Sequence, residues 1–182
     1  MRQKINNLIS VLYTLVKFCL IKLFRGKSFR FGLVERISPN VVTEFNRGSC
    51  VELENKVRIH SGSKIKVRKN AKLFIGKNVR INYNCMIVCH KEISIGEGTE
   101  FGPNVFIYDH DHDYRAGLKE NKFLYDSVTI GKNCWIGANT VILRGTTLGD
   151  NCVVGAGSVI KGSYDSDSVI LQKRETISKP VR

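Results

Sequence analysis

The chain has 182 residues, of which 42% are hydrophobic and 25% charged, and its 29 Lys and Arg against 16 Asp and Glu give a net charge of +13. This composition is typical of a globular protein and excludes a wholly disordered chain. The charge is uneven, because residues 1–80 hold 18 Lys and Arg against 4 acids, whereas residues 81–182 hold 11 against 12. Since a uniformly basic binder would not divide in this way, we expect no nucleic-acid partner.

Residues 8–24 form the one long apolar run, LISVLYTLVKFCLIKLF, which Lys17 and Lys22 interrupt. A spanning helix needs about 20 nearly uncharged residues, and no small-residue cleavage site of a secretory signal follows. Residues 1–30 are therefore predicted to form a basic amphipathic helix. Two interpretations stay open. The helix lies in the interface of an anionic membrane, or its apolar side packs on the domain or on a neighbouring subunit.

Large apolar residues recur every six positions along the rest of the chain. They are Ile75, Ile81, Ile87, Ile93, Ile95, Phe101, Ile107, Ile130, Ile136, Ile142, Leu148, Val154 and Ile160. A small residue follows most of them four positions later, namely Val79, Cys85, Thr99, Val105, Cys134, Thr140, Thr146, Cys152 and Ser158. A period of six fits neither a helix nor a plain strand, but it fits a solenoid whose every side is a short strand and a tight turn. We therefore predict an all-β solenoid with three sides to a coil, with Gly or Asn at its corners.

The solenoid is predicted to occupy residues 31–165 in about five coils, with a looser first coil from Leu53 to Ala71 and a tail at 166–182. Three of the six cysteines take the small interior position, and none of the six forms a CxxC pair. They indicate reduced thiols in a cytoplasmic protein and no zinc site. If residues 1–30 bind membrane, the protein is expected at the inner face of that membrane, held peripherally.

The repeat breaks between Ile107 and Ile130, so residues 108–129 are expected to leave the solenoid as a loop, which in a compact domain is usually functional. The loop opens with YDHDHDY and carries His110 and His112. One histidine could act as a general base. The alternatives are a metal site formed by the His-x-His pair with aspartates, and a solvated loop without chemistry.

Three motifs accompany this loop: PNV at 103–105, TIGKNCWIG at 129–137 and VGAGSVI at 154–160. Together with the repeat, they resemble the hexapeptide-repeat O-acetyltransferases of the maltose/galactoside type, and more narrowly those of bacterial surface-polysaccharide clusters. The resemblance covers roughly residues 53–165. It implies a left-handed parallel β-helix, acetyl-CoA as donor, a sugar hydroxyl as acceptor, no metal, and a homotrimer with its sites between subunits.

The resemblance also implies the site residues. The catalytic base in such enzymes stands nine residues after the Pro of PNV, which is His112 here, with His110 in reserve. Asn82 matches an acceptor-binding position, and His110 is also expected to contact the acceptor. The positions that would hold acetyl-CoA are Trp135, Gly137, Ala138, Ala156 and Lys161. One departure is Asp113, where the resembling enzymes have Pro, and a nucleotide contact from Lys173, Arg174 or Lys179 is as plausible as a solvated tail.

Two other functions are weighed against acetyl transfer. A zinc hydratase of the γ-carbonic anhydrase type uses the same solenoid, but His90, His110 and His112 do not keep its ligand spacing. A non-catalytic scaffold anchored by the basic segment is the third alternative.

Overall fold

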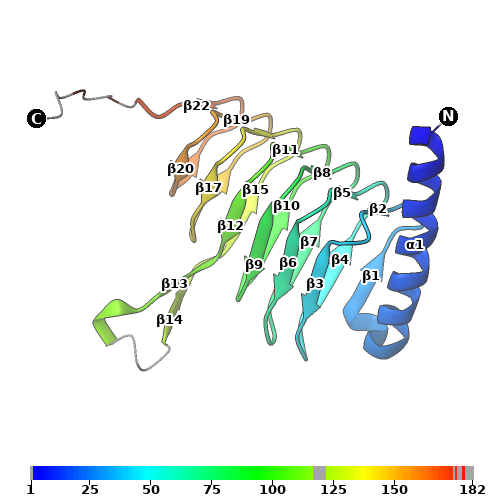
Figure 1. The fold of residues 1–182 in the computed structure, drawn as a ribbon. Helices are drawn as coiled ribbons and strands as arrows, with labels where there is room; N and C mark the ends of the chain where they lie inside the picture. Colours follow the sequence, from blue (N-terminus) through cyan, green and yellow to red (C-terminus); the bar gives the residue numbers. More distant parts are fainter. Residues whose placement is uncertain (1, 117–121, 174, 176–177, 179–182) are drawn as a thin grey trace, which may run out of the picture.

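The six-residue period produces a three-sided parallel β-solenoid with a helix at its N-terminal end and a hairpin projecting from its side (Figure 1). The computed structural model describes residues 2–116, 122–173, 175 and 178. Within them the three sides form three parallel sheets, and each strand pairs with the strand one coil away. This is the architecture that the repeat predicted.

Each sheet takes one strand from each successive coil. Sheet A contains β1 (Phe29–Phe31), β4 (Cys50–Leu53), β7 (Lys72–Ile75), β10 (Glu92–Ile95), β15 (Val128–Ile130), β18 (Thr147–Leu148) and β21 (Ser163–Tyr164). Sheet B contains β2 (Arg36–Ile37), β5 (Arg58–Ile59), β8 (Arg80–Ile81), β11 (Glu100–Phe101), β16 (Trp135–Ile136), β19 (Val153–Val154) and β22 (Val169–Ile170). Sheet C contains β3 (Val42–Phe45), β6 (Lys64–Val67), β9 (Met86–Cys89), β12 (Phe106–Tyr108), β17 (Val141–Ile142) and β20 (Val159–Ile160). The turns that lead from A to B, from B to C and from C to A are called the A–B, B–C and C–A corners.

The interior is filled as the repeat predicted. All thirteen repeated apolar residues are buried, and so are the nine small residues that follow them. The corners bend through left-handed backbone, which Gly and Asn adopt at low cost. The Asn residues with positive φ are Asn70, Asn78, Asn84, Asn104, Asn133, Asn139 and Asn151. Cys85, Cys134 and Cys152 are buried in the interior, as expected, and Cys89 is buried with them.

The solenoid begins at β1, close to the expected bound at residue 31, although the first coil was placed only at Leu53. Its last strand, β22, lies within the segment 166–182 that was expected to be a tail. The first coils were obscured because Phe29, Phe31 and Glu35 stand where later coils carry aliphatic or small residues.

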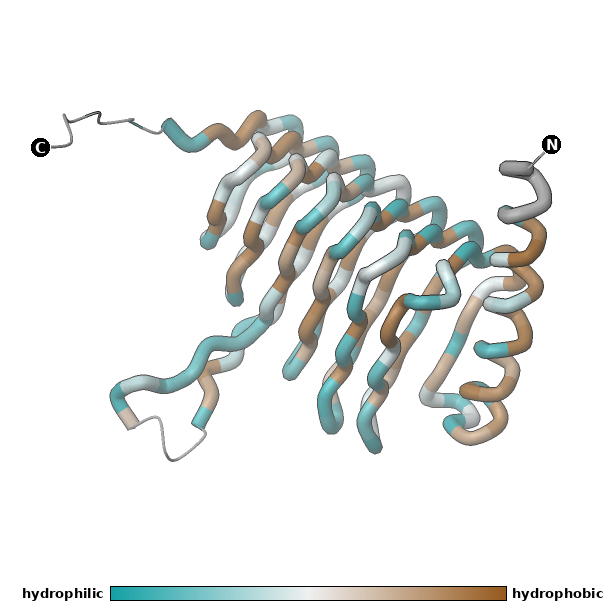
Figure 2. The backbone as a smooth tube through the Cα atoms, in the orientation of Figure 1, coloured by the Kyte–Doolittle hydropathy of each residue, from teal (hydrophilic) through white to brown (hydrophobic). Residues whose placement is uncertain are grey.

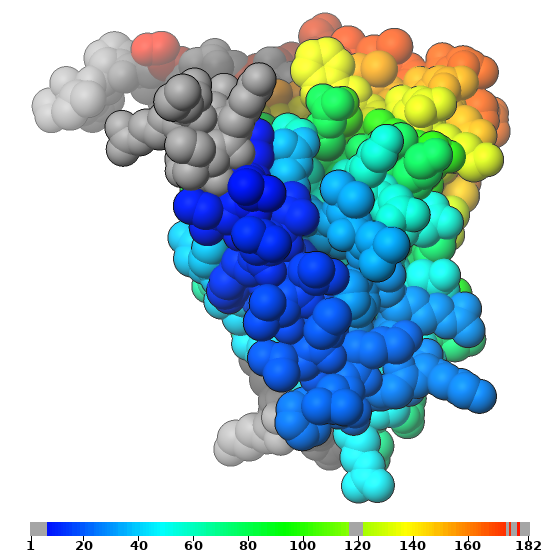
Figure 3. Space-filling model, turned by 90° about the vertical axis from the view of Figure 1, so that its right-hand side faces the viewer, coloured from blue at the N-terminus to red at the C-terminus, as the bar shows by residue number. Residues whose placement is uncertain are grey.

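Helix α1 (Arg2–Arg25) lies across the N-terminal end of the solenoid, followed by the short 3₁₀ turn η1 (Gly26–Ser28) (Figures 1 and 3). Its inner face packs on the first coil, where Phe18 is fully buried with its ring 5.1 Å from that of Phe29. The hydroxyl of Thr14 accepts the N–H of Ile37 at 3.0 Å, and the guanidinium of Arg25 donates to the carbonyl of Ser49 at 2.6 Å. An uncovered coil end would expose unpaired strand edges, so α1 serves as a cap. One face of this helix therefore packs on the domain, as one of the two interpretations expects.

The outer face of α1 is apolar and exposed. Successive helical residues are rotated by about 100° around the helix axis, so over residues 8–24 one uncharged arc of about 160° contains Leu8, Ile9, Leu12, Tyr13, Val16, Cys19, Leu20, Leu23 and Phe24, all of them exposed. Figure 2 shows this run of hydrophobic residues along the helix. We call it the apolar stripe. In the described part of the chain, Asn7–Ser28 is long and apolar enough to cross a membrane by length and composition alone. The contacts of α1 with the first coil favour a helix that lies on the protein over one that crosses a membrane.

Candidate active site

The chain leaves the solenoid after β12 and returns at β15, and between them it forms a projecting hairpin. Its two strands, β13 (His110–His112) and β14 (Phe123–Tyr125), are antiparallel, and the 3₁₀ turn η2 (Tyr114–Ala116) follows β13. The register places His110 opposite Tyr125 and His112 opposite Phe123. Both candidate histidines therefore lie on one short strand that starts at the C–A corner.

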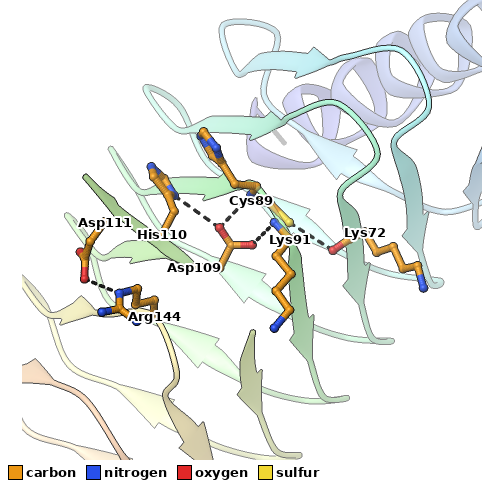
Figure 4. Close-up of polar contacts among 8 residues, drawn as sticks. Lys72, Cys89, Lys91, Asp109, His110, Asp111 and Arg144 are labelled. Carbon is orange, nitrogen blue, oxygen red and sulfur yellow. Dashed lines mark hydrogen bonds and ion pairs between the residues drawn. The ribbon is translucent and has the colours of Figure 1, made fainter. Parts of the chain in front are cut away.

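Asp109 anchors the base of the hairpin (Figure 4). Because β12 pairs with β9, Asp109 lies beside Cys89, and its carboxylate accepts the backbone N–H groups of His90 and Lys91 at 2.7 Å each. The side chain is fully buried. Burial raises the pKa of the Asp109 carboxyl, but hydrogen bonds from His110 and from these two N–H groups more than offset it and leave the pKa below its usual range. Asp109 is therefore a buried carboxylate that stays charged.

His110 is held between Asp109 and a second imidazole. Its Nδ1 is 3.4 Å from Oδ1 of Asp109, its ring stacks on that of His90 at 3.8 Å, and 13% of its side chain is exposed. Burial, followed by the proximity of His110, lowers the pKa of His90 to about 4. His90 is therefore neutral at neutral pH, and it supports His110 by stacking rather than by charge.

His112 has the opposite environment. Its side chain is exposed at the outer end of β13, and its ring centroid is 4.5 Å from that of Phe123. The residue between the two histidines, Asp111, accepts Nε of Arg144 at 2.6 Å, which ties the hairpin to the next turn of the C–A corner (Figure 4). The hairpin is thus fixed at its base while His112 remains accessible to a second molecule.

A basic groove of about 460 Å³ opens beside the hairpin. It is lined by Lys69, Asn70, Lys72, His90, Lys91, Glu92 and Tyr125. Three ammonium groups against one carboxylate make this side of the hairpin favourable for an anionic ligand.

The predicted site residues separate between two corners. The hairpin histidines and Lys161 belong to the C–A corner, whereas Asn82, Gly137, Ala138 and Ala156 belong to the B–C corner. Asn82 precedes β9 and the hairpin follows the parallel β12, so at least the length of one strand, about 10 Å, separates them. One chain therefore does not bring Asn82 and His112 together.

The residues predicted to hold acetyl-CoA differ in their exposure and packing. Trp135 is 62% exposed on the outer surface of sheet B, and Ala156 and Lys161 are also exposed. A Cβ on Gly137 would lie 2.5 Å from the backbone N of Ala156, so close stacking of coils already requires glycine there. Lys173 is exposed, and Arg174 and Lys179 lie outside the described residues.

Sequence reasoning missed Asp109 and Arg144, and it weighed His90 only as a zinc ligand. Asp109 could have been found, because it occupies the interior register position that Val67 and Cys89 fill in the two preceding coils. A charged residue at such a position needs partners. In the described ranges, no group of three or more His, Cys, Asp or Glu side chains has a geometry that could hold a metal ion.

Comparison with known proteins bears on this arrangement. Residues 127–161 match the family described as the hexapeptide repeat of succinyl-transferase. Nodulation protein L of Rhizobium leguminosarum bv. viciae is 47% identical over 70 residues, covering 36% of this chain and 35% of the relative. Galactoside O-acetyltransferase of Escherichia coli strain K12 is 35% identical over 65 residues, covering 35% and 32%. These matches span about a third of each relative.

Solved structures resemble nearly the whole chain. A variant of AntD, an N-acyltransferase from Bacillus cereus in complex with dTDP-4-amino-4,6-dideoxyglucose and coenzyme A, has a TM-score of 0.69 at 19% identity and covers 91% of this chain and 90% of its own. A maltose O-acetyltransferase from Clostridium difficile 630 has a TM-score of 0.52 at 25% identity, with coverages of 87% and 81%. The chain therefore resembles hexapeptide-repeat acetyltransferases in sequence and fold.

Proposed function

We propose that this hexapeptide-repeat protein is an O-acetyltransferase that moves an acetyl group from acetyl-CoA to a sugar hydroxyl of a bacterial surface polysaccharide or its precursor. The observation that carries the proposal is the projecting hairpin, in which a buried, charged Asp109 fixes a strand that presents an exposed imidazole. The local identity to a galactoside O-acetyltransferase and the fold shared with coenzyme A-bound AntD support it.

His112 is the proposed general base. A base must reach the proton that it removes, and His112 is exposed, whereas His110 is enclosed by Asp109, His90 and Phe123. The sugar hydroxyl gives its proton to His112 as its oxygen attacks the thioester carbonyl. The tetrahedral intermediate then expels the CoA thiolate, which takes the proton back from the imidazolium. His110 is assigned a positioning role.

The proposed site requires two subunits. Since the hairpin belongs to the C–A corner and Asn82 to the B–C corner, we propose a homotrimer in which the hairpin of one subunit faces the B–C corner of its neighbour. Gly137, Ala138 and Ala156 would then line the path of the pantetheine arm, with Trp135 beside it and Lys161 near the phosphates.

A thiol-release assay with acetyl-CoA and a panel of sugars tests this function. We expect His112→Ala to lower turnover by about 10²–10⁴-fold, the contribution of a positioned base, and His110→Ala to lower it less. Lys77→Ala, at an exposed position of the A–B corner that belongs to neither part of the proposed site, is the control. Near-normal turnover in the His112 variant would refute the assignment. Failure to bind acetyl-CoA would favour the scaffold, and bound zinc with hydratase activity would favour the zinc enzyme.

We also propose that the apolar stripe of α1 docks in the interface of an anionic membrane, which places the protein peripherally at the inner face. The stripe contains no charged residue, and the first 50 residues hold nine Lys and Arg against two acids. Of these two acids, Glu35 is buried and Glu44 pairs with Lys66 and Arg68. The end of the solenoid that α1 covers is therefore apolar and cationic, as an anionic bilayer surface requires.

Vesicle sedimentation tests the docking. We expect the protein to sediment with vesicles containing phosphatidylglycerol and much less with phosphatidylcholine alone. Leu20→Glu/Leu23→Glu should release it, whereas Val169→Glu/Leu171→Glu, which adds the same charge at exposed positions of the other end, should not. Deleting the whole helix is a poorer test because it uncovers the first coil.

A polarity-sensitive fluorophore on Cys19, in a Cys50→Ser background, gives a second measurement. Its emission should shift to the blue when anionic vesicles are added, and a label on Cys50 in a Cys19→Ser background should not respond. If the stripe variant instead loses self-association and the intact protein ignores vesicles, a second copy of the chain covers the stripe and the membrane proposal fails.

A further inference from the structure

Three arginines form a column on the outer surface of sheet B. Arg36, Arg58 and Arg80 each open a strand of this sheet, and the register pairs Arg36 with Arg58 and Arg58 with Arg80. Adjacent strands are about 4.8 Å apart, so the column extends over about 10 Å. Three like charges at this spacing repel one another unless something neutralises them.

Within the described residues, an acid neutralises only one end of the column. The next position in the register is Glu100, whose carboxylate lies 3.0 Å from the guanidinium of Arg80. In the described part of the chain, no acid lies within ion-pair distance of Arg36 or Arg58. The Nε of Arg58 is buried and has no hydrogen-bond partner there. The guanidinium groups of Arg36 and Arg58 are therefore left without a counter-charge among the residues that the structure describes.

Lys56 adds a fourth cation at a strained position. It has a φ of 66°, and every other described non-glycine residue with positive φ is Asn or Asp. Left-handed backbone costs a long side chain on the order of 1 kcal/mol that Gly or Asn would largely avoid. Asn78 occupies the equivalent corner position in the next coil, and it also has a positive φ. A residue kept in an unfavourable conformation points to a function for its side chain.

These cations surround one groove. It has a volume of about 640 Å³ and is lined by Val34, Arg36, Lys56, Arg58, Asn78, Arg80, Gly98 and Glu100. The groove lies on sheet B, whereas the hairpin leaves from the C–A corner, so it is separate from the basic groove beside His90.

We propose that this groove binds the diphosphate group of a phosphorylated ligand. A guanidinium group can bind two phosphate oxygens at once through two parallel hydrogen bonds. The column of about 10 Å is longer than one phosphate, so it accommodates two linked phosphates and the first atoms of the group that they carry. The ligand is either a nucleoside diphosphate or a lipid-borne diphosphate. The site does not depend on acetyl transfer, because it is defined by binding.

Isothermal titration with inorganic pyrophosphate at physiological ionic strength tests the site. We expect the intact protein to bind, and Arg58→Gln to weaken binding by at least about tenfold, as the loss of a charge-assisted contact should. Lys64→Gln, which removes an exposed cation from sheet C of the same coil, should stay within about twofold. Glu100→Gln frees Arg80 from its partner and should tighten binding.

Lys56→Asn separates a binding role from a structural one. It should raise the melting temperature of the free protein because it relieves the strained backbone, and it should weaken pyrophosphate binding. A purely structural lysine would not give these opposite effects. Comparison of uridine diphosphate with farnesyl diphosphate identifies the source of the ligand, and tighter binding of either supports the site. No binding to the intact protein, or equal binding by Arg58→Gln and Lys64→Gln, would overturn it.

Discussion

Replacing Glu35 with Gln should stabilise the protein at neutral and alkaline pH and have little pH-dependent effect near pH 4. Glu35 is 2% exposed at the first A–B corner, and neither of its carboxylate oxygens has a hydrogen-bond partner in the described part of the chain. It occupies the interior position that Val57 and Val79 fill in the next two coils. Burial raises the pKa of Glu35 to about 8, and the nearby backbone of Val57 and Gly32 opposes this only in part.

The sign and size of the effect follow from proton linkage. The folded protein holds the Glu35 proton up to about pH 8, whereas the unfolded chain releases it near pH 4.5. Between these values the folded state binds more protons, so its stability falls as pH rises and the loss levels off above pH 8. At about 1.4 kcal/mol per pKa unit, the difference sets an upper bound of about 5 kcal/mol. Relaxation around the charge reduces it, so we expect about 2–4 kcal/mol.

Thermal melts at a series of pH values from 4 to 9 measure this effect. A protein of this size shifts its melting temperature by about 2–4 °C per kcal/mol, so the gap between Glu35→Gln and the unaltered protein should widen by roughly 5–15 °C between acid and alkaline pH. Glu92→Gln, at an exposed position of sheet A, is the matched control. Melting curves of the Glu35 variant and the unaltered protein that stay parallel over the whole range would refute this account of the buried carboxyl.

Two further substitutions test the packing of the coils and the base of the hairpin. Gly131→Ala should destabilise the fold by about 1–3 kcal/mol, because its Cβ would lie 2.5 Å from backbone atoms of Gly149 in the next coil. At Gly155 the one atom closer than 3 Å to an added Cβ belongs to the exposed side chain of Leu171, so Gly155→Ala should lower the free energy of unfolding clearly less. Equal losses in urea unfolding would contradict the stacking argument. Asp109→Asn should lower the free energy of unfolding by about 1–3 kcal/mol, because the single oxygen of an amide cannot accept both backbone N–H groups. It should also lower turnover, because it disturbs His110. Unchanged stability and turnover would show that Asp109 does not anchor the hairpin.

Much of the fold was predictable from the sequence because its rule is local. Each coil must place a large apolar side chain in a narrow interior, a small one four residues later, and a left-handed residue at the corner. These demands repeat along the chain and remain visible at Ile130, Cys134 and Asn133 without knowledge of neighbouring coils. The loop between Ile107 and Ile130 was visible for the same reason, as a failure of the repeat.

The repeat was hidden where side chains outside the rule take its positions. Glu35 and the phenylalanines of β1 occupy interior positions of the first coil, so the six-residue repeat could be recognised only from Leu53 onward. The apolar run at 8–24 predicted an amphipathic helix, but its two possible partners could not be separated. The structure shows that one face of α1 covers the first coil while the apolar stripe faces outward.

The sequence by itself determined the repeating architecture, the position of its interruption and the two histidines worth testing, because each is encoded within a few neighbouring residues. Only the tertiary structure decided which side chains meet across coils. Asp109 reaches the backbone of His90, Arg144 reaches Asp111, and three arginines form one column. Those contacts join residues about 20 to 30 positions apart, and their spacing depends on how many residues each coil and loop contains. The physical reason is that the register between coils, and not the local period, sets which side chains become neighbours.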